Sequence, residues 1–288
     1  MRGKLKKLFA AVLAVLLALS FSGCSELTGL DAQALMSPPK TTADREAIYA
    51  LMGGGVGDVT LIYPKYGDYR SAIISRDLDG CGTSEVVSFC ANGDAGGTRL
   101  EFFKKNTDGV WSSMARFTSA ATQVDKVFFG DLTGDGMDEI IVGWGDPLTA
   151  TASVSVYYVD GDTIREFSMT TVSYSEMLLT DFDSDNIKEL FVLQAAQTSG
   201  EEIMALGGLY RFDGDQPYVS KTVPLDAAVT RYTSVSFSQV NSWRRAAVLD
   251  GVKADGRMLT QVIGYDEASD RLISPLSNEE NATDRPTA

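Results

Sequence analysis

Residues 131–139 read DLTGDGMDE, and two other nine-residue segments, starting at Asp77 (DLDGCGTSE) and Asp181 (DFDSDNIKE), align with them without gaps. The three starts are separated by 54 and 50 residues. A short strand-like run precedes each segment and an apolar run follows it, which predicts a repeated unit of two strands joined by an acidic loop. A degenerate fourth copy is expected to start at Ser238, 57 residues after Asp181. The predicted strands are 71–75 and 86–89, 126–129 and 140–144, 175–179 and 190–193, and, after the fourth copy, 246–249.

A second marker recurs with the same spacing. Aromatic-rich runs end in turn signals at Asp108-Gly109, Asp160-Gly161, Asp213-Gly214 and Tyr265-Asp266. Units of this length with about four short strands are typical of propeller blades, and the abundance of Asp-Gly turns excludes helical repeats. The predicted fold is therefore all-β: a propeller-like array of about four blades of four antiparallel strands, with a short N-terminal helix. Separate small domains are the alternative, although units this small bury little surface without neighbours.

The N-terminus has the pattern of an export signal. Four basic residues lie within residues 2–7, and the 12-residue apolar run 8–19 is too short to span a bilayer. The run leads to Phe21-Ser22-Gly23-Cys24, which resembles the lipobox of bacterial lipoproteins. This resemblance implies cleavage before Cys24, lipidation of Cys24 and anchorage to the outer face of the bacterial cell membrane. An ordinary secretory signal with an incidental cysteine is the alternative reading.

The sequence divides into five predicted regions. After the signal peptide (1–23) come a lipid-anchored linker (24–40), a short helix with a glycine turn (41–58), the repeats (59–275) and a polar tail (276–288). The apolar face expected for the helix contains Ala43, Ala47, Ile48 and Leu51. A further acidic loop would fall near or beyond Ala288, so either a small closed propeller of four units or a piece of a longer array is expected.

Composition excludes several classes of function. The chain has no histidine, which removes imidazole-based nucleophile systems and paired-histidine zinc sites, and its three cysteines cannot supply a four-thiolate site. Its 25 basic and 39 acidic residues give a net charge of −14, and removal of residues 1–23 leaves 21 basic residues against the same acids. We therefore expect no nucleic-acid partner and membrane contact through the lipid alone.

The acidic segments, repeated between pairs of strands, resemble the FG-GAP or VCBS-type repeats of integrin α-chain propellers and bacterial surface proteins. The resemblance covers about residues 59–275 and implies a calcium-binding propeller scaffold. It also implies that the backbone carbonyls at loop position 7 (Thr83, Met137 and Ile187) contribute to coordination.

Carboxylates at alternating positions of a tight loop, with a later acid closing the shell, are suited to a hard cation, and weak flexible sites favour extracellular calcium over magnesium. The third loop has the complete set; the second has Thr133 at one ligand position, and the first has Cys81, a poor calcium ligand. For each loop the alternative is a solvated Asp-Gly turn without an ion. The fourth copy has no carboxylate at the ligand positions and is expected to bind nothing. The expected side-chain ligands are Asp77, Asp79 and Glu85; Asp131, Asp135 and Glu139; and Asp181, Asp183, Asp185 and Glu189.

Cys81 and Cys90 are not expected to form a disulfide, because the extended run between Glu85 and Cys90 separates them too far. No Asp or Glu pair has a catalytic signature of its own. The sequence therefore favours a non-catalytic surface protein that presents loops to an unknown protein or glycan. A carbohydrate-active enzyme with a carboxylate pair on a propeller scaffold and a purely structural envelope component are the alternatives.

Overall fold

A computed structural model describes residues 43–146, 151–167, 172–199, 202–213, 216–241, 244–274 and 283–285. The chain divides into two compact units, Met1–Glu46 and Ala47–Ala288, and the second contains all of the sheets. The predicted signal peptide, Cys24 and the linker lie outside the described residues. Within these residues, no helix has the length and apolar character needed to cross a membrane.

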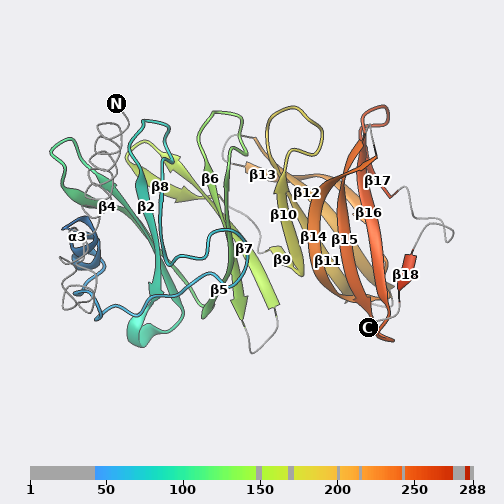
Figure 1. Cartoon of the computed structure of the whole chain (residues 1–288), viewed down its shortest axis with the longest axis horizontal. Coiled ribbons are helices and arrows are strands. Elements are labelled where there is room, and N and C mark those ends of the chain that lie inside the picture. The colour runs from blue at the N-terminus through green and yellow to red at the C-terminus, as the bar shows by residue number, and fades with distance from the viewer. Residues whose placement is uncertain are drawn as a thin grey trace, which may run out of the picture. The chain divides into compact units, whose positions relative to one another are not determined.

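Four antiparallel sheets, each made of consecutive strands, form the second unit, and Figure 1 shows them following one another in chain order. The all-β, propeller-like arrangement of four-stranded units is therefore confirmed. The first sheet contains β1 (Ile73–Arg76), β2 (Glu85–Ala91), β3 (Thr98–Lys105) and β4 (Trp111–Ser119). The second contains β5 (Gln123–Gly130), β6 (Glu139–Asp146), β7 (Thr151–Asp160) and β8 (Thr163–Glu166), with β9 (Val172–Tyr174) paired to β7. The third contains β10 (Glu176–Thr180), β11 (Glu189–Ser199), β12 (Glu202–Asp213) and β13 (Gln216–Pro224). The fourth contains β14 (Val229–Asn241), β15 (Arg244–Lys253), β16 (Met258–Asp266) and β17 (Arg271–Ile273), with β18 (Thr283–Arg285) paired to β16.

The local sequence accounts for this strand pattern. The second strand of a unit lies inside its sheet and reads as a continuous apolar run, as in β2, where residues 85–90 are all buried. The four turn signals fall at the end of the third strand of each sheet or just after it. A short 3-10 helix, Gly93–Ala95, connects β2 to β3. Strand β18 lies in the region expected to be a polar tail and was not predicted.

Three apolar clusters join consecutive sheets. One joins the first and second sheets around Phe102, Trp144 and Tyr157. Another joins the second and third sheets, and the last joins the third and fourth, where Phe182 lies 4.9 Å from Phe237 between ring centroids. Among the described residues, no apolar cluster is shared by the first and fourth sheets. The sheets are thus stabilised mainly by their neighbours in the chain.

Helix α3 (Ala43–Leu51) forms where the sequence predicted a helix. Ile48 and the following Met52 pack with Val86, Cys90 and Phe103 of the first sheet. The predicted apolar face is wrong in part. Ala43 is exposed, whereas Tyr49 is buried, because the helix contacts the sheet through its second half.

The fourth unit differs from the prediction at its first connection. Ser238 does not begin a loop but pairs with Ala246 inside the β14–β15 ladder, which continues to the Asn241–Arg244 pair. The long acidic connection of the other units is therefore replaced by two residues. Spacing alone misplaced this loop because the fourth copy has no acidic residues that mark its ends.

Candidate metal-binding loops and a polar pocket

The three acidic segments form three equivalent connections between the first and second strands of their sheets. The residue pairs Arg76–Glu85, Gly130–Glu139 and Thr180–Glu189 each enclose eight residues. The second and third loops also have the same order of buried, half-buried and exposed residues. The repeat seen in the sequence is thus a repeat in space.

Backbone conformation explains which residues occupy positions 4 and 6 of each loop. Both positions have positive φ in all three loops. Glycine occupies them in the first two loops, whereas the third has Ser184 (φ 66°) and Asn186 (φ 73°). Asparagine tolerates this region, but serine is held there with strain. The six residues are Gly80 and Gly82, Gly134 and Gly136, and Ser184 and Asn186.

The first aspartate of each loop accepts hydrogen bonds from the loop's own backbone. In the second loop, Asp131 accepts N–H groups of Gly134 at 2.6 Å and Gly136 at 2.9 Å. Asp181 does the same in the third loop with residues 184 and 186, at 2.7 and 3.0 Å. In the first loop, Asp77 accepts from Gly82 at 3.0 Å. These bonds curl each loop around its carboxylates.

The closing glutamates are the most buried acids of the loops. Glu85, Glu139 and Glu189 are 3%, 2% and 1% exposed, and each accepts the N–H of loop position 2 (Leu78, Leu132 or Phe182) at 2.7–2.9 Å. Burial raises the pKa of Glu85, and it raises the pKa of both Glu139 and Glu189 to about 7. Neighbouring loop carboxylates contribute to the raised pKa values, and Arg211 partly offsets the rise at Glu189. A cation at this place would relieve both effects.

Successive loops are connected by backbone hydrogen bonds. The N–H of Asp138 donates to the carbonyl of Leu78 at 3.3 Å, and the N–H of Lys188 donates to the carbonyl of Asp131 at 3.0 Å. The Asp138 side chain forms an ion pair with Arg76 of β1, so it faces the first sheet rather than the second loop. The loops therefore form one continuous row along consecutive sheets.

The predicted ligands converge to different degrees in the three loops. One ligand atom each from Asp181, Asp183 and Glu189 lie within 4.8 Å of one another, as do atoms of Asp77, Asp79 and Cys81. The second loop has Thr133 at position 3, and its three acids form no such group in the described part of the chain. Asp135 accepts the N–H of Met137 at 2.8 Å, as Asp185 accepts that of Ile187 in the third loop.

Each loop also has a buried acceptor or hydroxyl oxygen without a hydrogen-bond partner in the described structure: Asp77 Oδ1, Thr133 Oγ1 and Asp183 Oδ1. Such orphaned atoms fit a cation bound by oxygen ligands. The position-7 residues make different hydrogen bonds. The carbonyl oxygen of Thr83 accepts a hydrogen bond from the Cys81 thiol at 3.8 Å. Met137 and Ile187 each donate their N–H to the aspartate two residues earlier, at 2.8 Å.

The third loop contains a cation from its own sheet. Arg211, on β12, forms ion pairs with Asp183 and with Glu189, the latter at 2.6 Å, and lies 3.8 Å from Asp185. Burial of the guanidinium lowers the pKa of Arg211, but the hydrogen bonds and charges of Glu189 and Asp183 raise this pKa by more, so the net pKa is raised. The loop motif gave no indication of this residue.

The expectation for the cysteines is confirmed. Cys81 is an exposed thiol in the first loop, Cys90 is buried on β2, and both are free. Burial raises the pKa of Cys90, so this thiol is unreactive at neutral pH.

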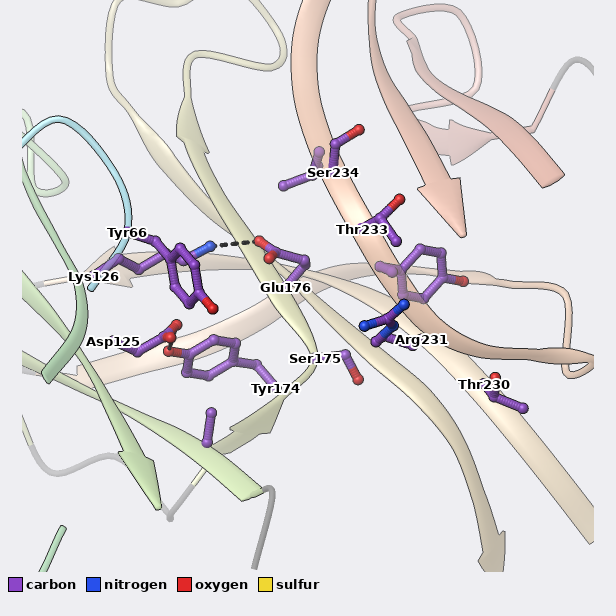
Figure 2. A pocket seen from close by; sticks show the side chains of 13 residues that line it. Tyr66, Asp125, Lys126, Tyr174, Ser175, Glu176, Thr230, Arg231, Thr233 and Ser234 are labelled. Atoms are coloured by element: carbon purple, nitrogen blue, oxygen red, sulfur yellow. Dashed lines mark hydrogen bonds and ion pairs between the residues drawn. The ribbon is translucent and has the colours of Figure 1, made fainter. Parts of the chain in front are cut away.

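A pocket of about 790 Å³ lies away from the loops, and Figure 2 shows the side chains that line it. It is formed by the connection before β1, the starts of β5, β7 and β10, the end of β9, and the first half of β14. From Glu176 to Asp181 the chain advances five residues, about 16 Å in an extended strand. The pocket and the acidic loops therefore lie toward opposite ends of the first strands.

Paired polar groups line the pocket. Lys126 Nζ lies 2.5 Å from Glu176 Oε2, and Tyr174 donates its hydroxyl to Asp125 at 2.6 Å. Burial, followed by the charge of Asp125, raises the pKa of Tyr174. Arg231, on the opposite wall in Figure 2, has no side-chain partner among the described residues. Its guanidinium is the charged group left for a ligand.

No pattern in the sequence indicates this pocket. Its walls come from Tyr66, Asp125–Lys126, Ala152, Tyr174–Glu176 and Thr230–Val235, which are far apart in the chain and share no motif. Only the register and packing of the sheets bring them together.

Comparison of the chain with models of known protein families gives no match, and comparison with curated protein sequences gives none either. We therefore infer the function from the geometry of the loops and the pocket.

Proposed function

We propose that this chain is an exported, lipid-anchored surface protein whose propeller-like scaffold, stabilised by calcium, binds a ligand without transforming it. The observation that carries the binding role is the pocket of about 790 Å³, which has the size of a small-molecule or short-glycan site. The resemblance of the acidic segments to FG-GAP or VCBS-type repeats supports the calcium-dependent scaffold.

The pairing inside the pocket favours binding over catalysis. Glu176 is engaged by Lys126, and Asp125 is engaged by Tyr174, so each carboxylate already has a strong donor. A glycosidase needs one carboxyl group to protonate the leaving oxygen and a second to act as base or nucleophile. Neither carboxylate is placed freely for such a role.

The chemistry of the walls favours a glycan as the ligand. Tyr66 is 47% exposed, with Lys65 Nζ 5.1 Å from its ring centroid. Thr233 and Ser234 lie on the opposite wall, where their hydroxyls donate to Asp250 and can still accept hydrogen bonds. Tyrosine faces and hydroxyls suit a hydroxyl-rich ring, and a free guanidinium such as that of Arg231 binds a carboxylate in a bidentate manner. An oligosaccharide containing an acidic sugar fits this combination.

A titration with two oligosaccharide panels tests the binding role. The full exported chain in detergent is titrated by calorimetry with neutral and with uronic-acid-containing oligosaccharides. We expect binding to the acidic panel that Arg231→Gln weakens at least tenfold, a loss of about 1.4 kcal/mol. Arg165→Gln, an exposed arginine of β8 outside the pocket, is the matched control. Equal binding by Arg231→Gln and wild type would reject the pocket as the site.

The same incubations test the enzymatic alternative, for which the presence of both Asp125 and Glu176 in the pocket is the specific support. Formation of new reducing ends that Glu176→Gln abolishes would establish catalysis and overturn the proposal. Anchorage is tested separately by detergent-phase partition. We expect the wild type in the detergent phase and Cys24→Ala in the aqueous phase, and an aqueous wild type would reject the anchor.

A further inference from the structure

The residue opposite the closing glutamate differs among the three loops. The pairs Val86–Phe103, Ile140–Tyr157 and Leu190–Tyr210 join the second and third strands of the three sheets. One residue beyond each pair, Lys104, Tyr158 and Arg211 stand across from Glu85, Glu139 and Glu189. Equivalent positions of one scaffold therefore carry an amine, a phenol and a guanidinium.

Only the guanidinium enters its loop. Arg211 contacts the carboxylates at positions 3 and 9 of the third loop, Asp183 and Glu189, and lies 3.8 Å from the position-5 carboxylate of Asp185. Lys104 instead pairs with Asp162 in the β7–β8 turn. The ring of Tyr158 packs 4.4 Å from that of Phe167, between ring centroids.

The guanidinium and a calcium ion compete for the same oxygens. Calcium requires six to eight oxygen ligands at about 2.3–2.6 Å. Glu189 Oε1 already accepts both Nε of Arg211, at 3.1 Å, and a terminal nitrogen at 2.6 Å. An ion that used Glu189 and Asp183 together would have to displace Arg211 from its partners, with loss of two charge-assisted hydrogen-bonded contacts.

The expected ligands of the other two loops have no such partner. Asp183 and Glu189 pair with Arg211, whereas neither Asp131, Asp135 and Glu139 nor Asp77, Asp79 and Glu85 form an ion pair in the described structure. The first loop has Cys81 at a ligand position, and a thiol is a poor ligand for calcium. The second loop is therefore the one that combines oxygen ligands alone with carboxylates that no basic side chain pairs.

We propose that Arg211 takes the place of a metal ion in the third loop, and that the calcium dependence of the scaffold is carried by the second loop through Asp131, Asp135 and Glu139. The role of Arg211 is inferred from its contacts, whereas the role of the second loop rests on the proposed calcium binding. The loop with the most complete set of carboxylates is thus the one that does not need the ion. Asp183 Oδ1, the oxygen that Arg211 leaves without a donor, can accept a hydrogen bond from water.

Counting calcium ions by calorimetry on the full chain in detergent tests both halves. Arg211→Gln removes the guanidinium and keeps the length of the side chain, so we expect one more bound calcium than in the wild type. Arg211→Lys keeps the charge and is expected to bind the wild-type number. Asp183→Asn in the wild-type background is expected to leave the number of ions unchanged, whereas Asp135→Asn reduces it by one or weakens the site at least tenfold.

Thermal unfolding in EDTA provides a measurement that does not depend on calcium. Removing one partner of a part-buried ion pair leaves the other charges uncompensated, so we expect Arg211→Gln to lower Tm by about 5 °C. Tyr158→Phe, at the equivalent position of the second sheet, is expected to change Tm by less than about 2 °C. With millimolar calcium, Arg211→Gln is expected to recover the lost stability.

The outcomes separate the two proposals. An ion lost on Asp183→Asn in the wild-type background would overturn the role of Arg211, as would an unchanged Tm of Arg211→Gln in EDTA. If no variant binds calcium but Arg211→Gln is destabilised in EDTA, the role of Arg211 stands and the proposed calcium binding is wrong.

Discussion

Glu139 closes the second loop from within the sheet, because its Oε2 accepts the N–H of Leu132 at 2.7 Å while only 2% of the residue is exposed. A buried carboxylate with two acidic neighbours, Asp131 and Asp135, is unfavourable unless a proton or a cation joins it, even though backbone N–H groups donate to it. This arrangement makes Glu139 the most informative residue of the loop.

Replacing Glu139 by glutamine should separate the contribution of this residue to the stability of the fold from its contribution to calcium binding. Glutamine retains an oxygen that can accept from Leu132 but removes the charge, so we expect Glu139→Gln to be at least as stable as wild type in EDTA at pH 8 and to lose the calcium-dependent rise in Tm. The control is Asp138→Asn in the same loop, whose side chain pairs with Arg76. Asp138→Asn should keep the calcium-dependent rise in Tm. Loss of this rise in Asp138→Asn would show that removing any charge from the loop abolishes the response to calcium.

The metal-free protein should become less stable as pH rises toward neutrality and beyond. Burial raises the folded-state pKa of Glu139 to about 7, above the ordinary value of 4.5. A raised folded pKa stabilises the protein fully below the unfolded pKa, and this stability is lost as pH rises through the folded pKa. In EDTA we therefore expect Tm to fall between pH 5 and 8, and to fall less in Glu139→Gln. Parallel pH profiles of the two proteins would contradict this assignment.

Strain at position 4 of the third loop predicts a stabilising substitution. Ser184 has φ of 66°, where glycine stands in the other two loops. Ser184→Gly should stabilise by up to about 1 kcal/mol, measured by urea unfolding. Gly136→Ala, whose added Cβ would meet no atom within 4 Å, should destabilise by a similar amount through its φ of +84° alone. A destabilised Ser184→Gly would mean that the Ser184 hydroxyl contributes more than the strain costs.

The sequence was sufficient to predict what is local and periodic. The strands flanking Asp77, Asp131 and Asp181 lie close to their predicted positions, because strand alternation and turn chemistry act within a few residues. The eight-residue connections place the acids of each segment in one loop, but only Asp181, Asp183 and Glu189 of the third loop, and Asp77 and Asp79 with Cys81 of the first, come within 4.8 Å of one another.

Contacts set by register could not be predicted in the same way. Arg211 reaches Glu189 from another strand, 22 residues away. A signal was nevertheless present: Tyr158 and Arg211 both stand two residues before the aspartate of a turn signal, Asp160 and Asp213. Aligning the turns as well as the loops would have shown that one unit has an arginine where the other has a tyrosine.

The shape of the pocket depends on a glycine in β6. A Cβ on Gly143 would lie 2.2 Å from the Tyr174 hydroxyl and 2.7 Å from Met177 Cε, so Gly143→Ala should displace Tyr174 from Asp125 and destabilise by about 1–3 kcal/mol. Gly145→Ala, on the same strand, meets its nearest atom at 3.4 Å and is the matched control. Urea unfolding of the two variants measures the difference. Equal stability would show that Tyr174 can move without loss.

The most direct test of the account is the thermal unfolding of the wild-type chain in EDTA, in magnesium and in calcium. Each site that binds only the folded protein should add about 2.7 kcal/mol at a hundredfold excess of calcium over Kd, which raises Tm by about 5–10 °C for a chain of this size. Magnesium, which requires stricter octahedral geometry, should give a much smaller rise. A Tm that is the same in EDTA and in millimolar calcium would contradict the claim that the scaffold contains an acidic loop whose bound calcium stabilises the array of sheets.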